Sequence, residues 1–240
     1  MDSTSDIKSK QQVELAIKLE NMSYKYDKTR IKPDLFVADW QVQARQHVFL
    51  KGESGSGKTT LLNLLAGVLV PNSGEITLLG EPFSQLSPQK IDAFRAKHIG
   101  VVYQQFNLIP FVSVLKNVQL AAHFGGTCAD QVEQTLADLL PKLALSTDCL
   151  RQAAGELSVG QQQRVAIARA LINHPDILLV DEPTSALDSA ARDAFMEVLL
   201  ALCNKFNTTL LFVSHDPQLQ EYFKSRINIA ELNTAQGDAI

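Results

Sequence analysis

The sequence has few cysteines, a single tryptophan and no cysteine pattern typical of a metal site. Cys128, Cys149 and Cys203 are widely separated, and no two of them form a C-x-x-C pair. This spacing excludes the common zinc sites, and an odd number of cysteines favours free thiols in a reducing cytoplasm. We therefore expect three buried structural thiols and no zinc ion.

Long apolar runs and a strong positive charge are absent as well. The longest apolar stretch, "LLNLLAGVLV", contains an asparagine and is far shorter than the roughly 20 residues of a membrane-spanning helix. The first twelve residues are polar and lack the apolar segment of a secretory signal. The formal net charge is -4, whereas nucleic-acid-binding surfaces are usually strongly basic. We expect a soluble chain that reaches a membrane only through a partner and binds no nucleic acid.

The sequence does contain apolar, strand-like runs that alternate with helix-like segments. Strands are expected at residues 13–22, 47–52, 74–80, 98–104, 176–182 and 208–216. Helices are expected between them, at residues 58–69, 87–97 and 189–206. Strands that alternate with helices indicate an α/β fold with a mostly parallel sheet.

The stretch from about residue 105 to residue 172 differs, because its segments have helical periodicity and none is a convincing strand. We therefore expect an α-helical subdomain inserted in the core. The whole domain is expected to span residues 13–225, between a polar tail at residues 1–12 and a short C-terminal tail at residues 226–240. The path of that second tail stays open.

Residues 52–59, "GESGSGKT", match the phosphate-loop pattern G-x-x-x-x-G-K-[ST] in full. Glycines let backbone N–H groups surround phosphate oxygens, and the helix that follows directs its own N-terminal N–H groups at the same anion. Lys58 can reach the β- and γ-phosphates, and the Thr59 hydroxyl can bind Mg²⁺. The residues expected to bind nucleotide here are Gly52, Glu53, Ser54, Gly55, Ser56, Gly57, Lys58, Thr59 and Thr60.

Two carboxylates follow the strand expected in "DILLVDE". Four apolar residues, from Ile177 to Val180, bury this strand and place Asp181 and Glu182 at its carboxyl end, where such sheets bind ligands. Asp181 is expected to hold Mg²⁺ or its bound water, and Glu182 to polarise the attacking water. Adjacent carboxylates can simply begin a solvated loop, but the complete phosphate-loop match favours the catalytic interpretation.

With these motifs, the sequence resembles the ATPase subunits of ABC transporters over nearly its whole length. In "VVYQQFNL", Gln104 is similar to the family's glutamine that contacts Mg²⁺ and water. "LSVGQQQR" is similar to the signature LSGGQ, and residues 185–188 in "VDEPTSALD" resemble the loop that crosses a dimer interface. His215 in "FVSHD" matches the histidine that senses the γ-phosphate. Tyr26 matches the aromatic residue that stacks on adenine, with Tyr24 as the alternative.

The resemblance implies a P-loop NTPase core with a mostly parallel sheet, an N-terminal antiparallel β subdomain and an inserted α-helical subdomain. It also implies an ATPase that binds ATP and Mg²⁺. The catalytic residues would then be Glu182, His215 and Gln104, and the metal would be held by Thr59, Gln104 and Asp181.

It further implies that two copies pair head to tail, so that the signature of one chain completes the ATP site of the other. The residues expected to act there are Ser158, Gly160, Gln161 and, in the interface loop, Asp188. We expect the helix to begin at Gln161, so that the Ser158 hydroxyl and the Gly160 N–H point at an anion. Val159 replaces the second glycine of LSGGQ, and its β-branched side chain should keep φ negative.

The expected partners are separate integral-membrane permease chains, because no segment of this sequence is long enough to span a membrane. They should dock near residues 106–117, "FNLIPFVSVLKN", at the cytoplasmic face of the inner (plasma) membrane. This region resembles the lipoprotein-releasing and macrolide-efflux group (the LolD/MacB type), which implies FtsX-, MacB- or LolC-like permeases. A non-transport ABC ATPase, such as a cell-division regulator of the FtsE type, is the alternative.

Overall fold

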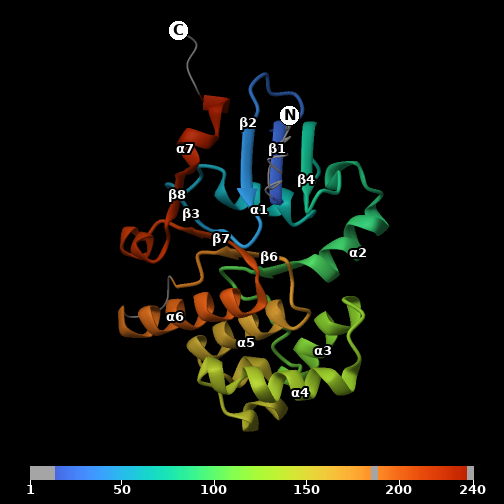
Figure 1. The fold of residues 1–240 in the computed structure, drawn as a ribbon, viewed down its shortest axis with the longest axis vertical. Helices are drawn as coiled ribbons and strands as arrows, with labels where there is room; N and C mark the ends of the chain where they lie inside the picture. The colour runs from blue at the N-terminus through green and yellow to red at the C-terminus, as the bar shows by residue number, and fades with distance from the viewer. Residues whose placement is uncertain (1–13, 185–188, 237–240) are drawn as a thin grey trace, which may run out of the picture.

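The computed structural model describes residues 14–184 and 189–236. Its larger sheet has five strands and lies across the middle of the molecule (Figure 1). Every pairing between these strands is parallel. In spatial order the strands are β5 (Ile99–Val102), β6 (Ile177–Asp181), β7 (Thr209–Ser214), β3 (His47–Lys51) and β8 (Ser225–Asn228).

A second sheet of three antiparallel strands lies at one end of the molecule. Its order is β2 (Leu35–Gln43), β1 (Leu15–Tyr24) and β4 (Ser73–Leu78). Helix α1 (Lys58–Leu65) lies between the two sheets (Figure 1). The α/β fold class with a mostly parallel sheet and a small antiparallel sheet is thereby confirmed, although β2 and β8 are not among the strands expected from the sequence.

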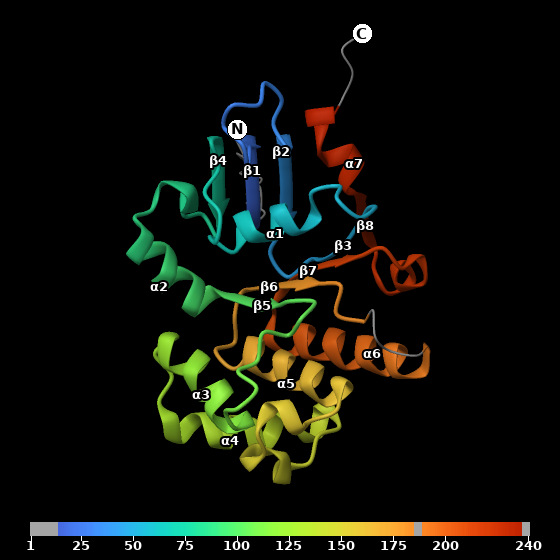
Figure 2. The same cartoon turned by 180° about the vertical axis from the view of Figure 1, so that it is seen from behind.

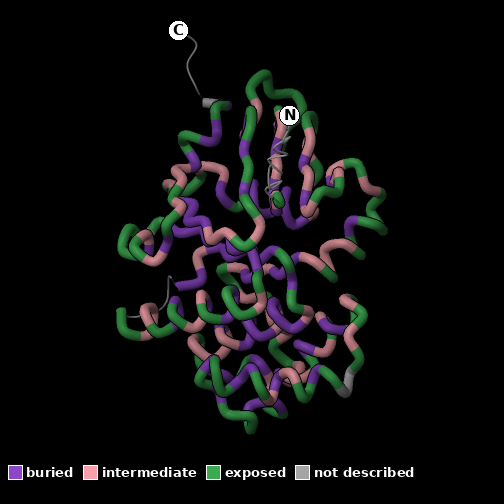
Figure 3. The backbone as a smooth tube through the Cα atoms, viewed as in Figure 1, coloured by how far each residue is buried: buried purple, intermediate pink, exposed green. Residues whose placement is uncertain are grey.

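The parallel sheet separates two hydrophobic cores because side chains alternate between the faces of a strand. In β3, Val48 and Leu50 pack in the core shared with α1 and the antiparallel sheet. Phe49, between them, packs in the other core together with Phe212 and Phe223. The buried residues in Figure 3 are therefore concentrated on both sides of the central strands. This burial fixes the sheet, and with it the loops at the strand ends.

Most of the other helices lie on the opposite side of the parallel sheet from α1 (Figure 2). They include α3 (Val114–Phe124), α4 (Ala129–Leu139), α5 (Val159–Leu171) and α6 (Ser189–Phe206), while α2 (Pro88–His98) leads into β5. Residues 105–172, which the structure describes throughout, contain no strand, and their one β-type pairing is an isolated bridge between Ser113 and Ala153. Buried apolar residues of α3 and α5 join the same core.

The C-terminal segment takes a path that the sequence left open. After β8 it forms the short helix α7 (Ile229–Leu232) and a 3₁₀ turn at Thr234–Gln236, and both pack against β2. Ile229 is fully buried, and a Cβ atom at Gly52 would collide with its side chain. Ile229, in the segment expected to belong to a tail, therefore packs directly against the phosphate loop.

The three cysteines differ in their exposure. Cys149 and Cys203 are buried free thiols, and burial raises the pKa of Cys203 to about 12. Cys128 is exposed, contrary to the expectation, because it lies just outside helix α4 at its N-terminal end.

Among the described residues, none of the helices is both long and apolar enough to cross a membrane.

Candidate active site

A cavity of about 930 Å³ opens at the carboxyl ends of strands β3, β5, β6 and β7. Parallel strands bring their carboxyl ends to one edge of a sheet, so the residues that follow them meet there. Of the predicted site residues, those lining the cavity are Tyr26, Glu53, Ser54, Gly55, Gly57, Lys58, Thr59, Thr60, Gln104, Asp181, Glu182 and His215. Gly52 and Ser56 belong to the same loop but do not line it.

The phosphate loop is shaped by two glycines in the left-handed region. Gly55 has φ +77, and Gly57, the N-cap of α1, has φ +103. No side chain caps α1, so its first N–H groups are available to an anion. The side chain of Lys58 is buried, and its Nζ donates to the carbonyl oxygens of Gly52 and Glu53, both at 2.7 Å. The loop therefore presents the Lys58 ammonium group and the first N–H groups of α1 to an anion.

Asp181, the last residue of β6, faces this loop. The Thr59 hydroxyl donates to Asp181 Oδ2 at 3.0 Å. Burial raises the pKa of Asp181, and the Thr59 hydrogen bond and the Lys58 charge oppose that shift only in part. A buried carboxylate of this kind is stabilised by a cation.

The donor set fits Mg²⁺ bound together with phosphates. A hydroxyl, a carboxylate and an amide oxygen, from Thr59, Asp181 and Gln104, line one cavity and are the hard oxygen ligands that Mg²⁺ prefers. The described residues contain no cluster of three or more His, Cys, Asp or Glu side chains suited to a metal. This agrees with the tendency of Mg²⁺ to take one or two carboxylates and complete its shell with phosphate oxygens and water.

Glu182 has an unusual backbone, with φ at +44. Left-handed backbone is uncommon for a residue other than glycine and is a feature of functional sites. The Glu182 N–H donates to the carbonyl of Val213 at 2.9 Å, while its side chain lines the cavity. Its Oε2 lies 2.9 Å from His215 Nδ1, and its Oε1 lies 3.7 Å from Lys58 Nζ. The carboxylate is thus held between two basic groups.

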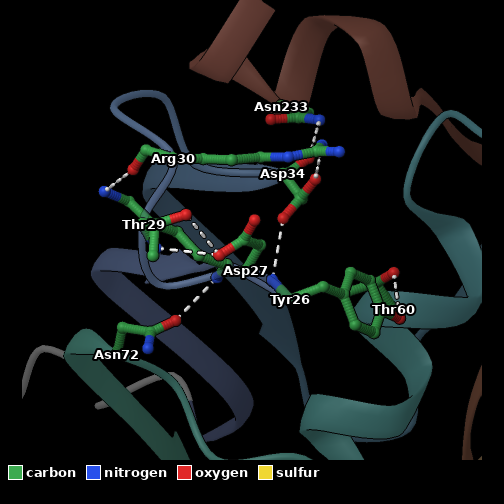
Figure 4. Close-up of polar contacts among 9 residues, drawn as sticks. Tyr26, Asp27, Thr29, Arg30, Asp34, Thr60, Asn72 and Asn233 are labelled. Carbon is green, nitrogen blue, oxygen red and sulfur yellow. Dashed lines mark hydrogen bonds and ion pairs between the residues drawn. The ribbon is translucent and has the colours of Figure 1, made fainter.

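Tyr26 forms the other end of the cavity. Its ring is 62% exposed and packs edge to face with Tyr24, with ring centroids 5.0 Å apart. Its hydroxyl lies 3.0 Å from Thr60 Oγ1 (Figure 4). Tyr24 does not line the cavity, so the geometry favours Tyr26 as the residue that presents a ring face to a base.

Four residues between positions 30 and 34 line the cavity beside Tyr26 and were not predicted from the sequence. They are Arg30, Lys32, Pro33 and Asp34. The cluster of cations in "KYDKTRIK" was the available signal, but it reads equally well as a solvated loop. The same loop carries Tyr26, whose hydroxyl lies 3.0 Å from Thr60 Oγ1 of α1, and this contact joins the loop to the nucleotide side.

The signature segment, residues 157–161, lies outside this cavity. Ser158, Gly160 and Gln161 are not among the residues that line the cavity. Helix α5 begins at Val159, two residues before the predicted start. The reason is a capping box: Ser158 Oγ accepts from the Gln161 N–H at 3.3 Å, and the Ser158 N–H donates to Gln161 Oε1 at 2.9 Å.

Val159 and Gly160 form the exposed start of helix α5 in the signature segment. Val159 is 53% exposed and has no positive φ, which confirms the expectation for its backbone. Gly160 faces open space, since a Cβ atom there would meet nothing within 4 Å. The N-terminus of α5 is therefore accessible to another molecule. Asp188, in the predicted interface loop, lies outside the described residues.

Comparison with known proteins agrees with this geometry. Residues 35–185 match the family model described as ABC transporter. The chain is 42% identical over 178 residues to the uncharacterized ABC transporter ATP-binding protein YbbA of Escherichia coli K12, covering 74% of this chain and 78% of YbbA. It is 35% identical over 219 residues to the lipoprotein-releasing system ATP-binding protein LolD of Hydrogenovibrio crunogenus, covering 91% and 95%. It is 36% identical over 200 residues to the thiamine import ATP-binding protein ThiQ of Photorhabdus laumondii, covering 83% and 80%.

The fold matches a solved structure over most of its length. The dimeric post-hydrolysis state of the ATP-binding cassette MJ0796, bound to ADP and Pi, superposes with a TM-score of 0.82 at 32% sequence identity. The match covers 91% of this chain and 95% of that one.

Proposed function

The chain belongs to the ABC transporter family as an ATP-binding subunit with ATPase activity, and on this basis we propose how its cavity hydrolyses ATP to drive separate permease chains. One observation carries the proposal. A single cavity brings together the ammonium group of Lys58, the carboxylates of Asp181 and Glu182, and the ring of His215.

In the proposed mechanism, Lys58 and the N-terminal N–H groups of α1 bind the β- and γ-phosphates. Glu182 lies beside Lys58, so its carboxylate faces the water that attacks the γ-phosphorus. It takes a proton from that water as the new P–O bond forms and the bond to ADP breaks, which leaves ADP and phosphate. His215 orients the Glu182 carboxylate through the 2.9 Å contact. Mg²⁺ on Thr59, Asp181 and Gln104 would neutralise phosphate charge.

Tyr26 is proposed to hold the adenine. Its exposed ring and its hydroxyl contact with Thr60 place it over the start of α1, next to the phosphate loop. A flat aromatic face on the solvent side of a phosphate site suits a nucleobase.

A second copy of the chain is proposed to complete the site. The signature residues lie outside the chain's own cavity, and the exposed N-terminus of α5 presents N–H groups that favour an anion. In a twofold dimer each signature would face the partner's γ-phosphate, giving two equivalent sites. The dimeric MJ0796 structure, similar over most of this chain, supports this arrangement. ATP would then close the dimer, and hydrolysis would release it.

The permease is proposed to dock on the helical side of the molecule. A groove of about 420 Å³ lies between α2, β5, α3 and α5, lined by residues that include Arg95, Tyr103 and Phe124. Phe111, in the segment 106–117, is 84% exposed, and Phe124 is 69% exposed. Phe124 lines the groove and Phe111 does not, but exposed apolar side chains of this size are typical of a protein interface. Arg169 of α5 connects this region to the segment that follows Gln104, since it donates to the carbonyls there.

We further propose that the chain is of the LolD/MacB type, working at the cytoplasmic face of the plasma membrane with FtsX-, MacB- or LolC-like permeases. The likeness to LolD covers 95% of that relative, whereas the likeness to ThiQ covers 80%.

The test is recovery of the permease. The tagged chain is isolated from detergent-solubilised membranes of its own organism, and co-purifying membrane proteins are quantified by mass spectrometry. Phe111→Ala should lower permease recovery about tenfold, as expected for an interface anchor, and leave ATPase activity of the isolated chain unchanged. Val70→Ala, at an apolar side chain that is 60% exposed elsewhere, is the matched control and should bind normally. Equal recovery with both variants would contradict the placement.

A further inference from the structure

We propose that Asn233, near the end of the described chain, is a positioning residue for the base side of the ATP cavity. The inference rests on the proposed function, in which Tyr26 packs against adenine. Asn233 does not line the cavity itself. It acts by holding the backbone of the loop at residues 25–34, which carries Tyr26, and by joining that loop to the phosphate loop.

The side chain of Asn233 makes three hydrogen bonds in a buried position, where it is 6% exposed. Its Oδ1 accepts from the N–H groups of Phe36, at 3.0 Å, and Ala235, at 3.1 Å. Its Nδ2 donates to the carbonyl of Asp34 at 3.3 Å. An amide group satisfied in this way fixes the backbone of β2 where the loop ends, because a buried polar group left without partners is costly.

Asp34 passes this constraint to Tyr26. Its Oδ2 accepts from the Tyr26 N–H at 2.8 Å, and its Oδ1 accepts from Arg30 Nη1 at 3.3 Å. The Tyr26 hydroxyl in turn contacts Thr60 of α1 (Figure 4). A continuous series of polar contacts therefore runs from Asn233 to the ring that faces the base.

Polar contacts hold the loop in place of a buried apolar anchor. At its first end the Lys25 N–H donates to Asn72 Oδ1 at 2.6 Å, and within the loop Lys25 Nζ donates to the carbonyls of Arg30 and Ile31. Residues 26–32 are all exposed (Figure 3), and Ile31 among them is 95% exposed. Without a buried apolar anchor, the position of the Tyr26 ring depends on polar contacts at the two ends of the loop. Asn233 is the residue that ties the second of these ends to another part of the chain.

The same segment also contacts the phosphate loop at both of its ends. Ile229 packs so closely on Gly52 that no Cβ atom fits there. The Nδ2 atom of Asn233 lies 3.7 Å from the position that a Cβ of Gly57 would take. The C-terminal segment is thus wedged between the phosphate loop and the loop of Tyr26, and it sets the spacing between the phosphate and base ends of the cavity.

The experiment measures ATP affinity and steady-state hydrolysis in the full chain. Asn233→Ala should weaken ATP binding about three- to tenfold, the equivalent of one or two modest hydrogen bonds, and raise KM similarly. The kcat at saturating ATP should stay within about twofold, because Glu182 and Lys58 are untouched. Leu232→Ala, at the neighbouring buried apolar residue, should lower Tm without weakening ATP binding.

A double-mutant cycle with Tyr26→Ala decides whether Asn233 acts through the tyrosine. In the Tyr26→Ala background, Asn233→Ala should change ATP affinity by less than about twofold, since residues in one network are not additive. Additive losses, or an unchanged affinity in folded Asn233→Ala, would overturn the proposal. If Tyr26→Ala itself binds ATP normally, the adenine role of Tyr26 is wrong instead. Should Asn233→Ala not fold, Asn233→Asp decides: it keeps the acceptor for Phe36 but loses the donor to Asp34, and normal ATP affinity in it would refute the inference.

Discussion

Replacing Arg169 with alanine tests how the signature helix holds the segment that carries Gln104. Arg169 Nη1 donates to the carbonyl of Asn107 at 2.6 Å, and Nη2 donates to the carbonyl of Phe106 at 2.7 Å. Both acceptor residues have positive φ, +55 for Phe106 and +51 for Asn107. Non-glycine residues in this region are held there by their surroundings. The guanidinium is therefore a clamp on a strained turn.

The loss of stability expected for Arg169→Ala follows from these two hydrogen bonds. Hydrogen bonds from a charged donor contribute about 1.5–3 kcal/mol each to stability, and partial relaxation of the freed turn offsets some of their loss. Arg169→Ala should therefore lower the free energy of unfolding by about 2–4 kcal/mol. For a domain of this size, that corresponds to a fall in Tm of roughly 5–15 °C. ATP turnover should also fall about tenfold, because Gln104 lies two residues before the released turn.

Scanning calorimetry and phosphate release measure both effects, and the same helix offers a control. Arg164 makes a single exposed contact with the carbonyl of Ala144 at 3.2 Å, so Arg164→Ala should cost less than about 1 kcal/mol. Arg169→Lys keeps the charge but not the forked donor, and should be intermediate. If Arg169→Ala matches Arg164→Ala in both Tm and turnover, the clamp does not exist.

The other variants test the signature and the metal carboxylate. Ser158→Arg should abolish hydrolysis, because it places a large side chain at the face proposed to meet the partner's phosphates. Val159→Gly should change turnover by less than about twofold, since Val159 is exposed in the first turn of α5. A many-fold rise in turnover in Val159→Gly would show that the valine restrains the enzyme. The pKa of Asp181 is raised by burial, so the folded state binds its proton more tightly than the unfolded chain, and this contribution to stability is present at low pH and lost as pH rises through the raised pKa. Asp181→Asn should therefore increase Tm at neutral pH while it removes Mg²⁺-dependent turnover, and a lowered Tm in calorimetry would contradict the assignment of burial as the cause.

Much of this architecture could be predicted from local sequence pattern. The strand before the phosphate loop, the loop itself and Asp181 at the end of β6 follow from apolar runs and from a motif whose residue types the chemistry requires. The absence of a left-handed backbone at Val159 was predicted from its β-branched side chain. Local patterns succeed where neighbours in the sequence decide the conformation.

Two kinds of feature were missed: a local one at the start of α5, and others that depend on residues distant in the sequence. The start of α5 at Val159 was missed because the sequence reading placed both Ser158 and Gly160 before the helix and overlooked the reciprocal bonds with Gln161. The positive φ of Glu182 accompanies a bond to Val213 on another strand. The path of the C-terminal segment depends on Asn233 meeting β2 across 197 positions of the chain.

The central claim is that two chains complete each ATP site and that Glu182 acts on the attacking water. The most direct measurement is the molar mass in solution of Glu182→Gln, determined by light scattering with and without ATP, together with phosphate release. The account predicts a dimer that forms only with ATP, persists because turnover is lost, and is abolished when Ser158→Arg is added. A monomer at saturating ATP, or turnover close to that of the unmodified chain, would contradict it.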